Sequence, residues 1–495
     1  MGHEMVAGHP ATMQSGSSLD GHESPQDTWG FVLSADDERL QAQSLWEDGR
    51  DSGREHPALS ATAFGVKRFS LFASIALLVN NVTGPGMTEI PEEFEEAGWI
   101  TPTVLMLLLT FASSAAALML CEAMRVIPGN GDFYLRYEYA SVVRHYFSEP
   151  AFYVALALLV INLTSTNVAS IVQSSQQMDG ALLSTPLGQS CGLQYYPAPP
   201  QLVCWEDNTE VFGRGSEIMV ASAGFLIVLV IVVPLSIMNL DDNIAIQNLA
   251  FLLLMSICVL WVGEVTACHL GLPEGWPSQH IAGFHAGGQS NLLGVLFFNY
   301  AFVIFVPSWM NEKQDDVPAD KAVFASTALS SLIFIVTGAW GALTYVFEAS
   351  EAGHDMLGHL ALDHACSAAP LSAAVFPFVV NMSGIPVFSI VVRYNLRENA
   401  VCSKGWAIFW SSVLPWALAL VLFGGRGLDY VIIWPGVFVT GVVNFLIPLL
   451  VYIKAVKWHG PALPRRPLPH TAMPPLGEGS GLAAPLLGEG GEGGE

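Results

Sequence analysis

The residues best suited to bind a charged small molecule lie in one short glycine-rich stretch. Gly84, Pro85 and Gly86 interrupt a segment that is otherwise apolar enough to cross a bilayer. They predict a broken helix, because proline removes a backbone donor and glycine resists helical order. A break at Thr83–Gly86 would present free N–H groups at the start of an outer half-helix, which can hold an anionic group such as a carboxylate. The two glycines would let the ligand approach the backbone.

A second apolar segment carries a similar irregularity. Asn299 lies in its middle, Tyr300 and Phe302 follow, and Pro307 disturbs the backbone hydrogen bonds one turn earlier. Carbonyl groups around Asn299–Phe302 could receive an ammonium group or a cation, and the two aromatic rings could shape a pocket, with Tyr300 as its gate. Within hydrocarbon, broken backbone is tolerated only where it is buried in protein or faces water. The alternative is a pair of ordinary proline kinks.

Two further groups of side chains could bind or carry an ion beside such a site. Asn80, Asn381 and Ser383 offer oxygen atoms of the kind that a sodium ion accepts. Glu89 lies on the predicted outer half-helix, and carboxylates inside a membrane are costly and therefore functional by default. It could carry a proton, or attract a cationic ligand by direct pairing. The expected coupling ion is H⁺ or Na⁺, with no other cofactor.

A polar cluster interrupts the third apolar segment. Asn162 and Thr166 lie one helical turn apart within it. Such clusters either line a pathway or hydrogen-bond neighbouring helices. We expect the cluster as a whole to join helices, with Asn162 and Thr166 as the candidates for ligand contact.

These residues need a membrane-embedded scaffold to bring them together. The chain has 495 residues, of which 52% are hydrophobic and 13% charged, whereas a soluble protein carries about 25% charged residues. Apolar runs of about 20 residues recur, the length that spans a bilayer as a helix. We expect an all-α membrane protein of ten transmembrane helices in a five-plus-five inverted repeat, at 69–97, 101–127, 150–179, 216–238, 244–268, 291–310, 322–347, 370–394, 405–423 and 429–453.

The distribution of charge predicts the topology. Segments 1–66 (acidic) and 456–495 (rich in Gly, Pro and Glu) lack hydrophobic periodicity, so we expect both to be disordered and cytosolic, flanking a membrane domain at 67–455. All basic residues except Arg214 and Arg426 then fall on the inner side, as the positive-inside rule requires. The net charge of −24 gives no signal for a nucleic-acid partner. The membrane could be the plasma membrane or a vacuolar or endolysosomal one.

The outer loops hold cysteines and histidines. Cys191 and Cys204 share the loop between the third and fourth helices, so a disulfide is plausible in an oxidising compartment. A second bridge, between Cys268 and Cys366, is a weaker alternative. His354, His359 and His364 recur every five residues and so do not share one helical face. We therefore expect a solvated or pH-sensitive loop there rather than a metal site.

The segment between the second and third helices alternates aromatic and basic residues. Tyr134, Tyr137, Tyr139 and Tyr146 are interleaved with arginines between residues 133 and 147. This pattern predicts a short interfacial helix with its aromatic rings towards lipid. A solvated cytosolic loop is the alternative.

The first helix resembles that of the amino acid/auxin permease family, within the amino acid–polyamine–organocation superfamily of LeuT-like fold. The shared pattern comprises Asn80, Gly84, Gly86, Pro91, Phe94, Ala97 and Gly98. The resemblance covers roughly 67–455, and weaker similarities lie at Pro307 and at Ser383–Ser389. This chain departs from the pattern at Glu92, Glu93, Glu95 and Glu96, and in having ten expected helices rather than eleven.

The resemblance implies a secondary active transporter of amino acids, coupled to protons in preference to sodium. Other possibilities are a sodium-coupled carrier, an organic-cation or polyamine carrier, and a membrane receptor that senses amino acids through the same site. No nucleotide-binding motif or catalytic set stands out, so neither a primary pump nor an enzyme is expected. The sequence leaves the oligomeric state open.

Overall fold

The computed structural model describes residues 66–183, 188–197, 199–205, 218–272, 275–289, 291–347, 356–363, 365–424 and 435–459. These residues belong to the unit Glu55–Glu495, and only this unit is described. The polar segments 1–66 and 456–495 lie outside the described residues except at their inner edges. His354 and His364 lie outside them as well.

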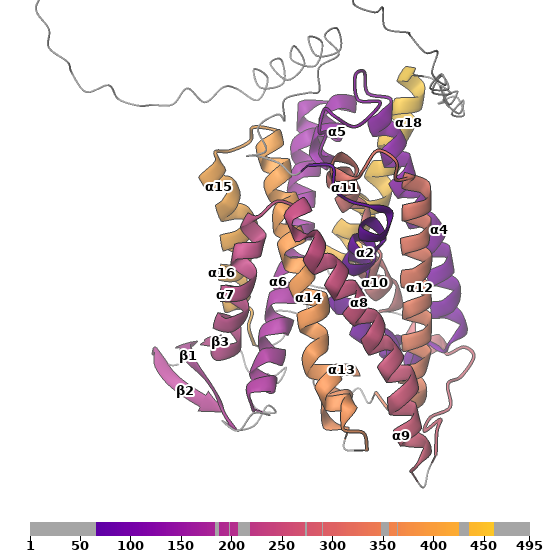
Figure 1. The fold of residues 1–495 in the computed structure, drawn as a ribbon, viewed down its shortest axis with the longest axis vertical. Helices are drawn as coiled ribbons and strands as arrows, with labels where there is room; N and C mark the ends of the chain where they lie inside the picture. Colours follow the sequence, from indigo (N-terminus) through magenta and orange to yellow (C-terminus); the bar gives the residue numbers. More distant parts are fainter. Residues whose placement is uncertain are drawn as a thin grey trace, which may run out of the picture. The chain divides into compact units, whose positions relative to one another are not determined.

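Long apolar helices dominate this unit and run side by side (Figure 1). Eight described stretches are long and apolar enough to cross a membrane, which confirms the predicted all-α membrane class. Seven of them are α4 (Ile100–Arg125), α6 (Glu149–Leu183), α8 (Ile244–Leu260) continuing into α9 (Thr266–Leu270), the stretch from α10 (Leu292–Asn299) to α11 (Val306–Glu312), α12 (Ala319–Thr344), α14 (Ala368–Glu398), and α15 (Lys404–Ile408) continuing into α16 (Leu414–Val421). The eighth, Phe438–Trp458, begins in π-helical turns and continues into α18 (Ile447–His459). Two shorter apolar helices are α2 (Leu71–Val82) and α7 (Ala223–Ile237). The five-plus-five repeat stays a prediction.

The first predicted segment is divided into three pieces. After α2, the 3₁₀ turn Pro85–Glu89 follows, and α3 (Ile90–Ala97) completes the segment. Proline suits the first position of the turn, because its nitrogen carries no hydrogen that would be left unpaired there. Gly98, with φ of +82°, ends α3 in a conformation that favours glycine. The predicted break is therefore present.

The sixth predicted segment is broken in the same way. α10 ends at Asn299, the turn Val303–Phe305 follows, and α11 then begins. Pro307 stands in the first turn of α11, where its missing N–H costs no helical hydrogen bond. The backbone N–H of Ile304, at the break, donates to Asn444 Oδ1 at 3.3 Å. Both predicted breaks are confirmed.

The loop between α6 and α7 forms a small antiparallel sheet that no sequence pattern predicted. β1 (Ser190–Tyr196) lies between β2 (Gln201–Trp205) and β3 (Met219–Ser222). Cys191 and Cys204 are opposite each other in the register of β1 and β2, and a disulfide with an S–S distance of 2.03 Å joins them. Figure 1 draws the sheet beside one end of α6 and α7.

The described part of the loop between α12 and α14 is packed rather than solvated. α13 (Met356–Leu362) buries Met356, Leu357 and Leu360. After it, Asp363 contacts His269 Nε2 at 2.8 Å and accepts a hydrogen bond from the Tyr345 hydroxyl at 2.8 Å. These bonds outweigh the effect of burial and hold the pKa of Asp363 below its usual range. A disulfide joins Cys268 and Cys366 next to this contact.

The prediction of an interfacial helix with its aromatic rings towards lipid is wrong for α5 (Tyr139–Tyr146). Tyr139 and Tyr146 are buried in protein, and their hydroxyls donate to the backbone oxygens of Val443 at 2.5 Å and Ala123 at 2.7 Å. An aromatic ring with a polar tip suits lipid headgroups and buried backbone acceptors equally, so the sequence pattern could not separate the two.

Glu138, immediately before α5, is a buried carboxylate near the end of α11. It is 2% exposed, and its two oxygens accept hydrogen bonds from Ser308 Oγ at 2.5 Å and Asn311 Nδ2 at 3.1 Å. Burial strips water from the carboxylate and raises its pKa to about 7, with a further contribution from the charge of Glu398.

We expect the protein to lose stability between pH 4.5, the ordinary pKa of a glutamate, and about 7, the pKa of folded Glu138. The folded state holds the proton more tightly than the unfolded state, so stability falls as the pH rises through this window. Glu138→Gln should remove on the order of 1–3 kcal/mol of that fall, measured by thermal unfolding in detergent. Glu149→Gln, at an exposed glutamate paired with Arg144, should keep the wild-type profile. If Glu138→Gln kept the wild-type dependence of stability on pH, Glu138 would not be the group that causes it.

Candidate functional site

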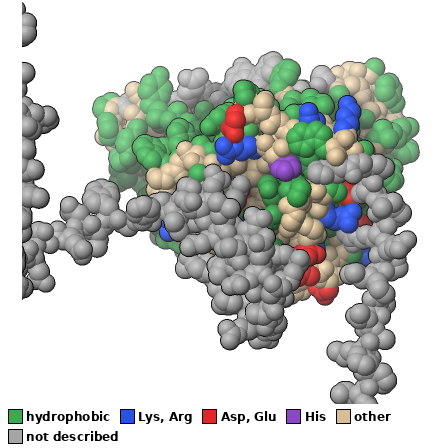
Figure 2. Space-filling model, turned by 90° about the horizontal axis from the view of Figure 1, so that it is seen from above, with side chains coloured by type: hydrophobic (Ala, Val, Ile, Leu, Met, Phe, Trp, Pro, Cys, Tyr) green, Lys and Arg blue, Asp and Glu red, His purple; other side chains and the backbone are tan. Residues whose placement is uncertain are grey.

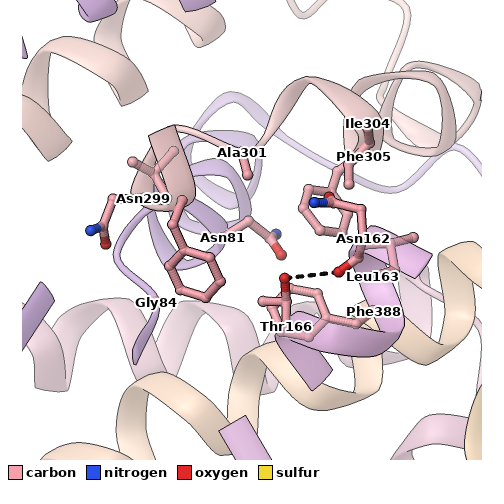
Figure 3. A pocket seen from close by; sticks show the side chains of 12 residues that line it. Asn81, Gly84, Asn162, Leu163, Thr166, Asn299, Ala301, Ile304, Phe305 and Phe388 are labelled. Atoms are coloured by element: carbon pink, nitrogen blue, oxygen red, sulfur yellow. Dashed lines mark hydrogen bonds between the residues drawn. The ribbon is translucent and has the colours of Figure 1, made fainter. Parts of the chain in front are cut away.

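The two helix breaks meet at a small buried cavity. The centre of a water molecule could move within about 10 Å³ of this cavity. That volume is close to what one bound water needs. Its walls come from α2 and the first break, from α6, from α10 and the second break, and from α14 (Figure 3). The lining residues are Asn81, Val82, Gly84, Asn162, Leu163, Thr166, Phe298, Asn299, Ala301, Ile304, Phe305 and Phe388.

Three asparagines give this cavity its polarity. The amide nitrogens of Asn81 and Asn299 donate to backbone oxygens one turn earlier in their own helices, at 2.7 and 2.9 Å. Since a backbone oxygen can only accept, these bonds fix which end of each amide is the donor. Asn162 Nδ2 donates to Thr440 Oγ1 at 2.6 Å. The Oδ1 atoms of all three are buried and accept no hydrogen bond within the described residues. The cavity therefore presents acceptors to a ligand.

The two glycines of the first break have different surroundings. A Cβ atom at Gly86 would lie 2.7 Å from Asn299 Nδ2 and 3.0 Å from the Phe298 ring, so this glycine allows the two breaks to touch. A Cβ atom at Gly84 would meet nothing within 4 Å. Gly84 lines the cavity and Gly86 does not.

The structure brings Asn162, Thr166, Gly84 and Asn299 of the predicted ligand-binding residues to the cavity. Figure 3 shows Thr166 donating to the backbone oxygen of Asn162, at 3.0 Å. Sequence reasoning missed the neighbouring residue Asn81. Its only sequence signal is its amide, which Asn80 shares.

The other predicted ligand-binding residues lie elsewhere. The Tyr300 hydroxyl is 2.5 Å from Ser331 Oγ on α12, so its ring leaves the cavity rather than gating it. Thr83 Oγ1 donates to the Val79 backbone oxygen at 2.8 Å and caps the end of α2. Phe302 is buried outside the lining.

The predicted sodium ligands are connected through a glutamine that the sequence did not single out. Asn80 Nδ2 donates to Gln247 Oε1 at 2.9 Å, and Gln247 Nε2 donates to the Ser383 backbone oxygen at 2.8 Å. This amide links α2, α8 and α14. Asn381 bonds separately to Gln173 Oε1 at 2.7 Å. Glu89, at the end of the 3₁₀ turn, is partly exposed and does not line the cavity.

Comparison with known proteins identifies a family. Residues 67–468 match the family model described as transmembrane amino acid transporter protein. No curated protein matches the chain.

The solved structures that resemble this one include three of a manganese transporter from Eremococcus coleocola. They are a histidine-to-alanine mutant, a glutamate-to-alanine mutant, and a complex with an aromatic bis-isothiourea substituted compound. Each is 12% identical to this chain and covers 81% of it. The TM-scores are 0.41, 0.42 and 0.41, and the matched shares of those chains are 96%, 96% and 89%.

We expect Gly86→Ala to destabilise the protein by about 1–3 kcal/mol, because the added methyl group pushes Asn299 and Phe298 away from the first break. Gly84→Ala should leave the stability nearly unchanged, since its methyl group enters open space. Thermal unfolding of both variants in the same detergent tests this difference. Equal destabilisation by the two substitutions would contradict the difference in packing around Gly84 and Gly86.

Proposed function

Because this chain belongs to the transmembrane amino acid transporter family, we propose that it carries amino acids by alternating access around the cavity between the two helix breaks. The observation that carries the proposal is the meeting of both breaks at one small cavity lined by Asn81, Asn162 and Asn299, whose amide oxygens accept no hydrogen bond within the described residues. Discontinuous helices that meet in this way are typical of secondary transporters.

The chemistry of the cavity suits the two charged groups of an amino acid. The unpartnered Oδ1 atoms of Asn81 and Asn162 can accept hydrogen bonds from an ammonium group. The carboxylate would bind at the first break once the half-helices separate, where the positive end of the outer half-helix dipole lies. In the state described here Pro85 has no N–H and the Met87 N–H donates to the Gly84 oxygen at 3.1 Å. Phe298, Phe305 and Phe388 provide apolar walls for the side chain.

The size of the cavity indicates a closed state. Space for about one water cannot hold an amino acid. The half-helices must separate to admit a substrate, and the breaks are the positions at which α2 and α3, or α10 and α11, can tilt independently. A carrier that alternates between open and closed states behaves in this way.

Proton coupling is favoured over sodium coupling. At the predicted sodium position, the Gln247 amide already donates to the Ser383 backbone oxygen. This N–H donor occupies one of the two lone pairs of that oxygen and places a partial positive charge beside the predicted sodium position, which disfavours a second cation there. The carboxylates of the outer half-helix are then the remaining candidates for coupling.

Uptake of a panel of labelled amino acids into proteoliposomes tests the proposal, at acidic and neutral external pH, with and without sodium. Uptake that rises at acidic pH and ignores sodium is expected. Binding without flux would favour the sensing receptor, and uptake of polyamines alone would favour the organic-cation carrier.

We expect Asn81→Leu to weaken substrate binding by about tenfold or more, since an ammonium group loses one acceptor in a buried site. The apparent KM for uptake and direct binding to purified protein measure this loss. Ser256→Ala, at an exposed serine whose hydroxyl bonds only within its own helix, is the matched control. Unchanged binding in Asn81→Leu would exclude Asn81 from the site.

A further inference from the structure

The outer half of helix 1 contains a buried carboxylate that lacks a partner for one of its oxygens. Glu93 is 4% exposed, and its Oε2 atom is buried and accepts no hydrogen bond within the described residues. The other glutamates of α3, at positions 92, 95 and 96, are only partly buried. Glu95 Oε2 accepts a hydrogen bond from the backbone N–H of Phe347 at 2.7 Å. Glu93 is therefore the glutamate of α3 that is closed off from water.

The half-helix α3, which carries Glu93, packs closely against α12. A Cβ atom at Gly338 of α12 would lie 2.7 Å from Ile90 and 2.8 Å from Phe94. A Cβ atom at Gly341 would lie 2.7 Å from Pro91. These two glycines allow α3 and α12 to approach each other closely.

The charges that act on Glu93 are all negative. They belong to Glu96, Glu92 and Glu89, on the same half-helix. Each disfavours a further negative charge on Glu93.

The elements packed against α3 contribute little that could compensate the charge. Before α10, His285 Nδ1 lies 3.2 Å from the backbone oxygen of Glu96, and α10 itself contains no charged residue. The His359 ring of α13 stacks on Tyr345, with the ring centroids 5.5 Å apart. The charged residues of α4 and α12 lie at the far ends of those helices from α3, at Glu122, Arg125, Asp320 and Lys321.

We propose that Glu93 is a proton-binding site, and that the outer half of helix 1 closes against α12 only when this carboxyl group is protonated. An ionised carboxylate buried without a cation or a full set of hydrogen bonds is strongly disfavoured. A proton from the outer solution bonds to a carboxylate oxygen as the half-helix closes, and it returns to water when the half-helix opens. The proposal rests on the proposed function and names its proton-binding group as Glu93 in place of Glu89.

Substrate exchange in proteoliposomes, measured as a function of external pH, tests the role of Glu93. In the wild type, exchange should fall by about tenfold per pH unit once Glu93 ionises in the open state. Glu93→Gln imitates the protonated group, so it should exchange substrate at a rate that no longer depends on pH. Glu92→Gln, a partly exposed neighbour, should keep the wild-type profile.

A wild-type pH profile in Glu93→Gln would overturn the proposal. Loss of the profile in Glu89→Gln would then assign the proton to Glu89 instead. Infrared spectroscopy of the purified protein gives a readout that needs no transport. The wild-type-minus-Glu93→Gln difference spectrum at neutral pH should contain the carbonyl band of one protonated carboxyl group, since Glu138 contributes equally to both proteins. If the band is present but no amino acid is carried, the proposed function fails and the proton site stands; if the band is missing, the proton site fails.

Discussion

The need to satisfy every backbone polar group within hydrocarbon governs this structure. A helix that breaks inside a membrane leaves donors and acceptors that no water can reach, so each break has to be enclosed by protein. Here the break between α2 and α3 lies against the break between α10 and α11, with Gly86 close to Asn299. Asn444 accepts a hydrogen bond from the Ile304 N–H, and Thr83 caps α2. The cavity exists because the same packed helices surround both breaks and their polar groups.

The sequence predicted the class of fold and the positions of the breaks, because composition and Gly-Pro-Gly act locally. It did not predict the rotation of each helix. Asn80 and Asn81 differ by about 100° around α2, and only packing decided that Asn81 faces the cavity while Asn80 bonds to Gln247. The same limit explains why Tyr300 turns towards Ser331. Contacts distant in sequence also decided the burial of α5.

In the centre of the bundle, neutral side-chain amides form hydrogen bonds between helices. Gln247 connects α2, α8 and α14, and Asn162 connects α6 with Thr440. Neutral hydrogen bonds can break and reform as helices move, whereas a buried ion pair that loses its partner leaves an uncompensated charge. Neutral hydrogen bonds therefore suit the proposed mechanism, in which the half-helices separate in every transport cycle.

The lining of the cavity also bears on the charge of the ligand. None of its described residues is Asp, Glu, Lys or Arg, so a bound ion would meet only dipoles. A cation alone would meet the amide oxygens of Asn81 and Asn162 but would bring a net charge into a medium of low dielectric, at high cost. A zwitterion brings no net charge, and its ammonium group matches these amide oxygens. The neutrality of the cavity therefore favours an amino acid over a polyamine, and it leaves net charge to be handled outside the cavity, where α3 holds its glutamates.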